Sequence, residues 1–383
     1  MSAGSVCLDE QTMLDFLAGS LGRDARSKAL GHIDGCEDCR AVLASLASQR
    51  RRSSAPATTP VPSLFQPTQA LPQLGRYRLE QKLPAGGMGE VYLATQLGPG
   101  GFERPCVVKM PYEGDPELVK LFFAEAKALA SVEHPNVARV LELGEEDDRP
   151  FLAMELIVGK SLKEVIAEYR RERLVVPLPA ALEVVRQAAL GLGAAHAAVD
   201  RRGESLELIH RDVSPNNLML ARDGVVKVID FGLARSKHGE KTEAGVVKGT
   251  PRYFSPEQAK GAPLDARTDI FSLGLVLYEL LTSERAYDDE SAPALVMRAA
   301  RGDVPRDRPD HVPPRVWKLL ARCTELEPRR RFPSMAALLD ALDEVAGPGG
   351  PAAAAALAAR SAKAMVEGQE TQPVAALSSR TRR

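Results

Sequence analysis

The sequence predicts an α+β fold with two lobes, a small β-rich lobe followed by a larger helical one, and a small helical module that precedes both. Short alternating apolar segments dominate residues 77–155, as strands with one buried face require. After about residue 160, apolar residues recur at spacings of three and four, which is typical of helices with one buried face. A proline-rich stretch separates both regions from residues 1–49, which contain three of the five cysteines.

The region in front of the two lobes is expected to be a small module followed by a linker. Residues 1–49 predict two short helices, at about 9–18 and 23–46. Residues 50–76 contain five prolines together with Ser, Thr and Gln, and few apolar residues that could anchor a fold. Such a composition cannot bury enough surface to fold and behaves as an extended spacer.

The small lobe is expected to combine a sheet with a single helix. That helix spans about 116–131, with Asp115 as its cap and Pro116 in its first turn. The expected strands lie at 77–83, 91–97, 104–110, 138–144 and 150–155.

The larger lobe is expected to be mostly helical and to end before a tail. One helix is indicated by the apolar stripe Leu182, Val185, Ala189, Leu192 and His196. Residues 346–383 combine a Gly/Pro stretch, an Ala run and a polar, Arg-ending segment, and show no packed-core pattern. We therefore expect a disordered tail, in which the Ala stretch can be transiently helical.

Charge and hydropathy favour neither nucleic acid nor membrane as a partner. The formal net charge is −1 and the pI is about 6.6, which leaves no basic excess for binding a polyanion. The most apolar helical run, 270–282, contains Glu279 and is shorter than the roughly 20 residues that a bilayer requires. Residues 1–20 lack a basic region followed by an apolar run, so we expect no secretory signal and a cytoplasmic location.

Two segments supply a candidate base and two candidate metal ligands. HRDVSPNN at 210–217 contains Asp212 and Asn217, and DFG at 230–232 begins with Asp230, thirteen residues after Asn217. In-line transfer of a γ-phosphoryl group requires a carboxylate near the attacking hydroxyl and oxygen ligands for magnesium. The two segments therefore predict phosphoryl transfer.

These motifs resemble those of bacterial, eukaryotic-like Ser/Thr protein kinases, and the resemblance covers about 77–345. It implies a bilobal protein kinase-like fold, ATP and Mg²⁺ (or Mn²⁺) as cofactors, and protein substrates. It also implies that Asp212 orients the substrate hydroxyl or accepts its proton, and that Asn217 and Asp230 bind the metal ion. Ser214 stands where most of the family has a lysine, which predicts weaker charge stabilisation in the transition state.

The small lobe contains further family motifs. LPAGGMGEVYLA at 83–94 resembles the glycine-rich loop, with Pro84 in place of its first glycine. Lys109 ends an apolar run and is expected to hold the α- and β-phosphates. Glu125 is a charged residue on an apolar helix stripe and is expected to pair with Lys109, as the resemblance also implies. A solvated glutamate at the helix edge is the alternative.

The resemblance also implies a nucleotide pocket. Met154 takes the gatekeeper position, after which the backbone groups of Glu155 and Ile157 would bind adenine. The expected ATP-binding residues are Leu83, Gly86, Gly87, Gly89, Val91, Val107, Lys109, Glu155, Ile157 and Met219.

Between DFG and SPE at 255–257 lies a segment with the length of an activation segment. Thr242 and Thr250 are the predicted phosphorylation sites, and a phosphate on Thr242 could pair with Arg211, although Thr242 can also be an ordinary loop residue. Thr250 is expected near Asp212, which favours Ser/Thr over Tyr substrates. Autophosphorylation in trans would involve a homodimer. Glu257 and Arg331 match the family's buried ion pair, and Asp269 matches the aspartate that braces the catalytic loop.

The module at 1–49 contains a candidate zinc site. His32, Cys36 and Cys39 are spaced by four and three, so on a helix they share one face, and Cys7 can complete a tetrahedron. This pattern resembles the zinc-finger domain of zinc-binding anti-sigma factors and implies a structural Zn²⁺. Ordinary reduced cysteines and a thiol–disulfide sensor formed by Cys36 and Cys39 are the alternatives.

The sequence thus predicts a cytoplasmic Ser/Thr protein kinase with a zinc module that receives a signal or a regulatory partner. The alternative from another class is a pseudokinase scaffold, which Pro84 and Ser214 favour. A third hypothesis assigns the main output to anti-sigma binding through residues 1–49.

Overall fold

The computed structural model describes most of the two lobes and a few positions in front of them. The described residues are 12, 25, 28–29, 31–32, 36, 73–83, 89–112, 116–200, 202–231, 250–288, 291–346 and 350–367. The chain divides into two units, Met1–Gln66 and Pro67–Arg383, and every element discussed below belongs to the second. The two helices predicted at about 9–18 and 23–46 lie largely outside the described residues.

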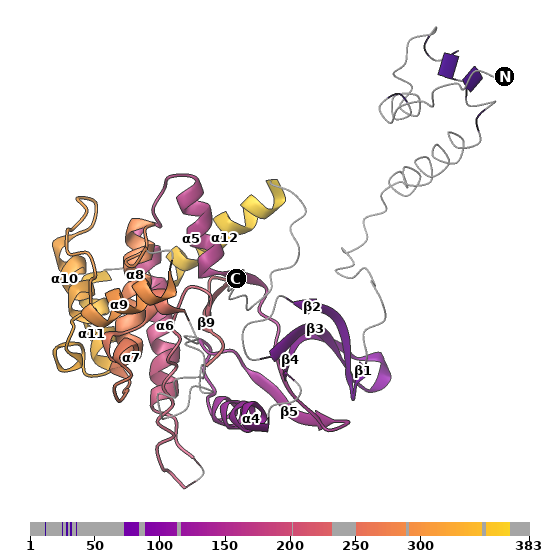
Figure 1. Ribbon diagram of the computed structural model, residues 1–383, viewed down its shortest axis with the longest axis horizontal. Coiled ribbons are helices and arrows are strands. Elements are labelled where there is room, and N and C mark those ends of the chain that lie inside the picture. Colours follow the sequence, from indigo (N-terminus) through magenta and orange to yellow (C-terminus); the bar gives the residue numbers. More distant parts are fainter. Residues whose placement is uncertain are drawn as a thin grey trace. The chain divides into compact units, whose positions relative to one another are not determined.

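The small lobe is an antiparallel sheet with one helix, as the sequence predicted, but the sheet has six strands where five were expected (Figure 1). The order of strands across the sheet is β1-β2-β3-β4-β6-β5. The helix is α4 (Pro116–Ala130). The strands are β1 (Gln73–Leu74), β2 (Tyr77–Leu83), β3 (Gly89–Leu97), β4 (Glu103–Pro111), β5 (Val140–Glu146) and β6 (Arg149–Glu155).

Alternation along the strands gives the sheet two different faces. One face carries an apolar cluster in which the rings of Tyr77 and Phe151 meet edge to face at 5.4 Å. The opposite face of β4 carries Val107 and Lys109, which are both buried. Lys109 therefore lies on the face of the sheet that is opposite to the apolar cluster, and this face is also buried at β4.

The two edges of this sheet meet, and the contact shifts the predicted start of the folded lobe. Arg76 Nε and Tyr77 Oη donate to Glu142 Oε2 on β5, over distances of 2.9 Å and 2.6 Å. Gln73 and Leu74 pair with β2. The prediction that 50–76 is all linker is therefore wrong at its end, because Gln73 and Leu74 form strand β1 and Gly75 and Arg76 form the turn into β2.

The larger lobe is mostly helical, with a small sheet next to the connection from the small lobe. The sheet has the order β7-β8-β9 and consists of β7 (Gly159–Ser161), β8 (Leu218–Ala221) and β9 (Val226–Val228). The helices are α5 (Leu162–Arg171), α6 (Leu178–His196), α7 (Pro256–Lys260), α8 (Arg267–Thr282), α9 (Ala292–Arg301), α10 (Pro314–Cys323) and α11 (Met335–Ala346). Among the described residues, no helix is both long enough and apolar enough to cross a bilayer.

A further helix, α12 (Gly350–Glu367), forms where the sequence predicted a disordered tail. Its residues Ala354, Leu357, Ala358 and Ser361 recur at helical spacing and are buried. Three of these four residues are small, so the stripe gave no core signal in the sequence, but small side chains allow helices and loops to approach closely. A Cβ on Gly224 would lie 2.6 Å from the backbone nitrogen of Ala355.

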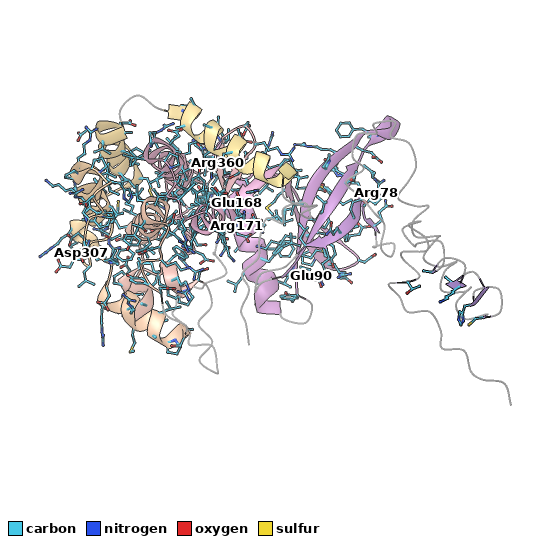
Figure 2. The ribbon with its side chains drawn as sticks, turned by 90° about the horizontal axis from the view of Figure 1, so that it is seen from above. Arg78, Glu90, Glu168, Arg171, Asp307 and Arg360 are labelled. Carbon is cyan, nitrogen blue, oxygen red and sulfur yellow. The ribbon has the colours of Figure 1, made fainter. Side chains whose placement is uncertain are left out.

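Polar contacts at the other end of the buried stripe attach α12 to α5 and β7. Lys160 Nζ donates to the carbonyl of Ser361 at 2.7 Å and also pairs with Glu168. Arg360 pairs with Glu172, and its guanidinium lies 4.8 Å from the ring centre of Tyr169. Arg360 and Glu168 lie close together in Figure 2. The larger lobe therefore includes α12 as a packed element.

Leu357→Ala is expected to lower the free energy of unfolding by about 2–3 kcal/mol, because it removes a buried side chain and leaves a cavity. Urea unfolding followed by circular dichroism measures this loss. Ala356→Ser, at an exposed position on the same turn, is the control and should change stability by less than about 0.5 kcal/mol. An unchanged midpoint for Leu357→Ala would mean that α12 does not dock in solution.

Candidate active site

The loop that contains Asp212 is held by a buried aspartate on α8, as predicted. Asp269 accepts hydrogen bonds from the backbone N–H groups of His210, at 2.8 Å, and Arg211, at 2.9 Å. His196 Nε2 lies 2.7 Å from the same carboxylate. Burial alone raises the pKa of Asp269, but the His196 contact and the backbone N–H of His210 lower it overall. A charged, fully buried carboxylate thus fixes the backbone that precedes Asp212.

The carboxylate of Asp212 lies between its own loop and Thr250, near the end of the predicted activation segment. Asn217 Nδ2 donates to the backbone carbonyl of Asp212 at 2.8 Å and to its Oδ2 at 3.2 Å. The backbone N–H of Thr250 donates to Asp212 Oδ1 at 3.3 Å. The prediction that Thr250 lies near Asp212 is confirmed. These contacts fix the orientation of the Asp212 carboxylate.

Asp230 and Lys109 meet across the two lobes. Lys109 Nζ lies 2.9 Å from Asp230 Oδ1, and the lysine side chain is only 9% exposed. The backbone of Asp230 has a φ of 53°, which is uncommon for a residue with a Cβ and is characteristic of functional sites. The next residue, Phe231, is buried with its ring centre 4.7 Å from that of His210. This packing holds the Asp230 carboxylate beside Lys109.

The side-chain oxygens of Asn217 and Asp230 are suitable ligands for a magnesium ion. Because the amide nitrogen of Asn217 faces Asp212, its oxygen is left to act as a ligand, and Asp230 adds carboxylate oxygens. Hard oxygen donors of this kind, completed by phosphate oxygens and water, are what Mg²⁺ prefers. The backbones of Asn217 and Ile229 are hydrogen-bonded at 3.0 Å, so the two ligands come from segments that are tied together.

The predicted nucleotide pocket is only partly within the described residues. Gly86 and Gly87 lie outside them. Gly89 is required for a packing reason, because a Cβ there would lie 2.0 Å from the carbonyl oxygen of Met110. Glu155 is partly exposed, and no hydrogen bond to the backbone N–H of Ile157 is found among the described residues. The apolar members are buried, namely Leu83, Val91, Val107, Ile157 and Met219.

Several other predicted residues fall outside the part of the chain that the structure describes. The side chain of Glu125 is one of them, so its pairing with Lys109 stays a prediction. Thr242 is another. Of the zinc candidates, Cys7 and Cys39 lie outside, and no cluster of three or more potential metal ligands is found among the described residues.

The predicted ion pair between Glu257 and Arg331 is confirmed. Arg331 Nη1 and Nη2 donate to the two carboxylate oxygens of Glu257 at 2.6 Å and 2.8 Å. Burial alone raises the pKa of Glu257, but the Arg331 guanidinium lowers it below its usual value. Thr268 on α8 donates to the same carboxylate, so the pair fastens α7 to α8 and to the segment before α11.

Sequence reasoning missed one ion pair beside the site. Lys227 Nζ on β9 lies 2.7 Å from Glu155 Oε1, at the end of β6. A signal was present, since Lys227 interrupts the apolar run 225–229 just as Lys109 ends its own run. The partner could not be read, because Glu155 is 72 positions away in sequence.

Acid is expected to destabilise the protein through Glu257 and Asp269. Both have a lowered pKa in the folded state. The stability that each contributes is complete above its unfolded-state pKa, about 4, and is lost as the pH falls through its folded-state value. Urea midpoints between pH 6 and pH 3 should therefore fall below about pH 4.5. A constant midpoint would contradict this prediction, and Glu327→Gln, at an exposed position, is the control that should leave the profile unchanged.

Comparisons with known proteins agree with this geometry. The sequence model of the protein kinase domain matches residues 77–341. The tyrosine-protein kinase MasK of Myxococcus xanthus is 40% identical over 276 residues, which cover 70% of this chain and 43% of MasK. The serine/threonine-protein kinase PknL of Mycobacterium tuberculosis is 35% identical, with 71% of this chain and 66% of PknL covered. The probable serine/threonine-protein kinase CPE1738 of Clostridium perfringens is 33% identical, with 70% and 38% covered. The chain therefore spans between about two fifths and two thirds of these relatives.

Proposed function

The chain belongs to the protein kinase family, and on this basis we propose that it transfers the γ-phosphoryl group of ATP to serine or threonine hydroxyls of protein substrates. One observation carries the proposal: the Asp212 carboxylate is oriented by both Asn217 and the backbone of Thr250. A carboxylate held in this way can align a hydroxyl and accept its proton as the phosphoryl group leaves ATP.

The other site residues have separate roles in this mechanism. Lys109 would hold the α- and β-phosphates, with Glu125 as its proposed partner. Asn217 and Asp230 would hold Mg²⁺ (or Mn²⁺), which neutralises the phosphate charge when bound. Lys109 pairs with Asp230 directly, so the two charges lie together at the end of the site that we assign to the phosphates.

Ser214 is the main argument for a pseudokinase scaffold. Its hydroxyl is neutral and supplies no cation to the site. The side chain is also fully buried, and its Oγ has no hydrogen-bond partner among the described residues. The base, both metal ligands and Lys109 are nevertheless retained. We therefore favour an enzyme with a reduced transition-state contribution at this position over a scaffold.

The class of acceptor hydroxyl needs its own test, because one relative is named a tyrosine kinase and two are named serine/threonine kinases. The position of Thr250 beside Asp212 and the names of the latter relatives support serine or threonine. Phosphoamino acid analysis after incubation with Mg-ATP decides between them.

We also propose autophosphorylation of Thr242 and Thr250 in a transient homodimer. The proposal for Thr242 is supported by Arg211, a cation next to Asp212 that could bind the phosphate and order the segment. Phosphopeptide mapping of the parent and of Asp212→Asn tests it. A phosphate that persists in the variant would exclude autophosphorylation.

For the module at 1–49 we propose a structural Zn²⁺ held by Cys7, His32, Cys36 and Cys39, and a regulatory partner. The support is the spacing of these residues in the sequence. A cytoplasmic location also stays a prediction from sequence. Metal analysis of the purified full chain should give one zinc per chain, and Cys36→Ser should lose it. Absence of zinc from both proteins would exclude the site.

A further inference from the structure

The short connection between the lobes is enclosed by a ring of contacts. It comprises residues 156–158 and joins β6, which ends at Glu155, to β7. β7 pairs with β8, and β8 pairs with β9, where Lys227 lies directly opposite Met219. The ion pair from Lys227 to Glu155 returns to the start of the connection. The chain, two ladders of hydrogen bonds and one ion pair thus form a closed circuit.

The Glu155 carboxylate also joins a second segment to this circuit. Its Oε1 accepts a hydrogen bond from the backbone N–H of Arg139 at 2.8 Å. The backbone N–H of Glu155 in turn donates to the carbonyl of Arg139 at 3.0 Å. Glu155 is therefore bonded through both its backbone and its side chain, and three segments meet at one oxygen atom.

The Lys227–Glu155 pair lies at a different end of the site from the Lys109–Asp230 pair. Lys109 and Asp230 connect the lobes beside the metal ligands. Lys227 and Glu155 connect them at the position where the backbones of Glu155 and Ile157 would bind adenine. Their side chains are 18% and 23% exposed, so water screens the charges less than at an open surface.

We infer that Lys227 is a positioning residue for the adenine ring of the nucleotide, acting through the Glu155 carboxylate. This inference rests on the proposed function. Lys227 holds the end of β6 against β9, and so fixes the adenine-binding backbone relative to Met219 on β8, one of the expected ATP-binding residues. Without Lys227 the backbone must be ordered when the nucleotide binds, which lowers affinity.

The test compares adenosine with ATP, since only ATP reaches the phosphate end. Isothermal titration of the full chain measures both affinities in the parent and in Lys227→Met. We expect the affinity for each ligand to fall about tenfold in Lys227→Met, because the charge-assisted bond from Lys227 to Glu155 no longer orders the backbone that binds adenine. In contrast, Lys109→Met should weaken ATP and leave adenosine within about twofold.

Two variants separate positioning from general destabilisation. Lys227→Arg keeps the positive charge, so its adenosine affinity should stay within about threefold of that of the parent, unlike that of Lys227→Met. Lys160→Met removes a buried lysine on the neighbouring β7, whose partner Glu168 lies on α5 away from the connection. It should lower the melting temperature but leave adenosine affinity within about twofold.

Glu155→Gln keeps the backbone groups and should lower adenosine affinity as Lys227→Met does. The double variant Glu155→Gln with Lys227→Met should bind adenosine no more weakly than either single variant. If Lys227→Met fails to fold, Glu155→Gln gives the same adenosine readout. Parent-like adenosine binding, a loss for ATP alone, or an equal loss in Lys160→Met would overturn the inference. If the parent binds nucleotide but transfers no phosphoryl group, the proposed function fails while the binding result still decides this inference.

Discussion

Asp212→Asn is expected to slow phosphoryl transfer to a protein substrate by about 10²–10⁴-fold, the range that general base catalysis supplies. The amide keeps the shape of the side chain and can still accept the Thr250 N–H, but it cannot accept a proton from the attacking hydroxyl. ATP affinity should remain within about threefold, since Asp212 is not a predicted contact of the nucleotide. Initial rates with saturating Mg-ATP and a generic substrate measure the effect.

Asp223→Asn is the matched control for this change. It makes the same substitution at an exposed turn between β8 and β9, where the side chain accepts the backbone N–H of Val225. Its rate should stay within about twofold of the parent. If both variants retained the parent rate, the general base would have to be a group other than Asp212.

Arg331→Met is expected to lower the free energy of unfolding by about 3–5 kcal/mol, because it leaves the Glu257 carboxylate buried without its partner. The arginine side chain is fully buried, and it also donates to the backbone carbonyls of Glu325, Arg267 and Leu326. Urea unfolding of the full chain at neutral pH measures the loss.

The neighbouring Arg330 provides the control for that variant. Its side chain is 68% exposed and pairs with Glu327, so Arg330→Met should cost less than about 1 kcal/mol. Replacing Glu257 as well, in Arg331→Met with Glu257→Leu, should recover part of the loss because the lone buried charge is removed. Equal stability of the two arginine variants would mean that the buried pair is not a strong contributor.

Local patterns in the sequence predicted the elements of the small lobe well. All five predicted strands and the helix at 116–131 appear in the structure within a few residues of the expected bounds. Alternation of apolar residues and an N-terminal proline are local signals, and they suffice when the sheet and helix are regular. The strand β1 escaped prediction because it has only two residues, too few to show an alternating pattern. The Arg76 contact to Glu142 escaped because the two residues are 66 positions apart in sequence.

The helix α12 was missed for a different reason. An alanine run has high helix propensity but no contrast between its faces, so the sequence could not indicate that one face would be buried. What decides the outcome is the surface on which the run packs. Gly224 leaves room for its backbone, and the Lys160 ammonium is close enough to bond the Ser361 carbonyl.

The sequence by itself determined the family and the chemical groups of the site, because Asp212, Asn217, Asp230 and Lys109 lie in short motifs whose spacing is informative. Only the tertiary structure decided which of these groups meet. Lys109 and Asp230 are 121 positions apart, and Lys227 and Glu155 are 72 positions apart. Pairing of this kind depends on how the two lobes fold against each other, and a charged residue in an apolar strand shows that a partner is needed without showing which one.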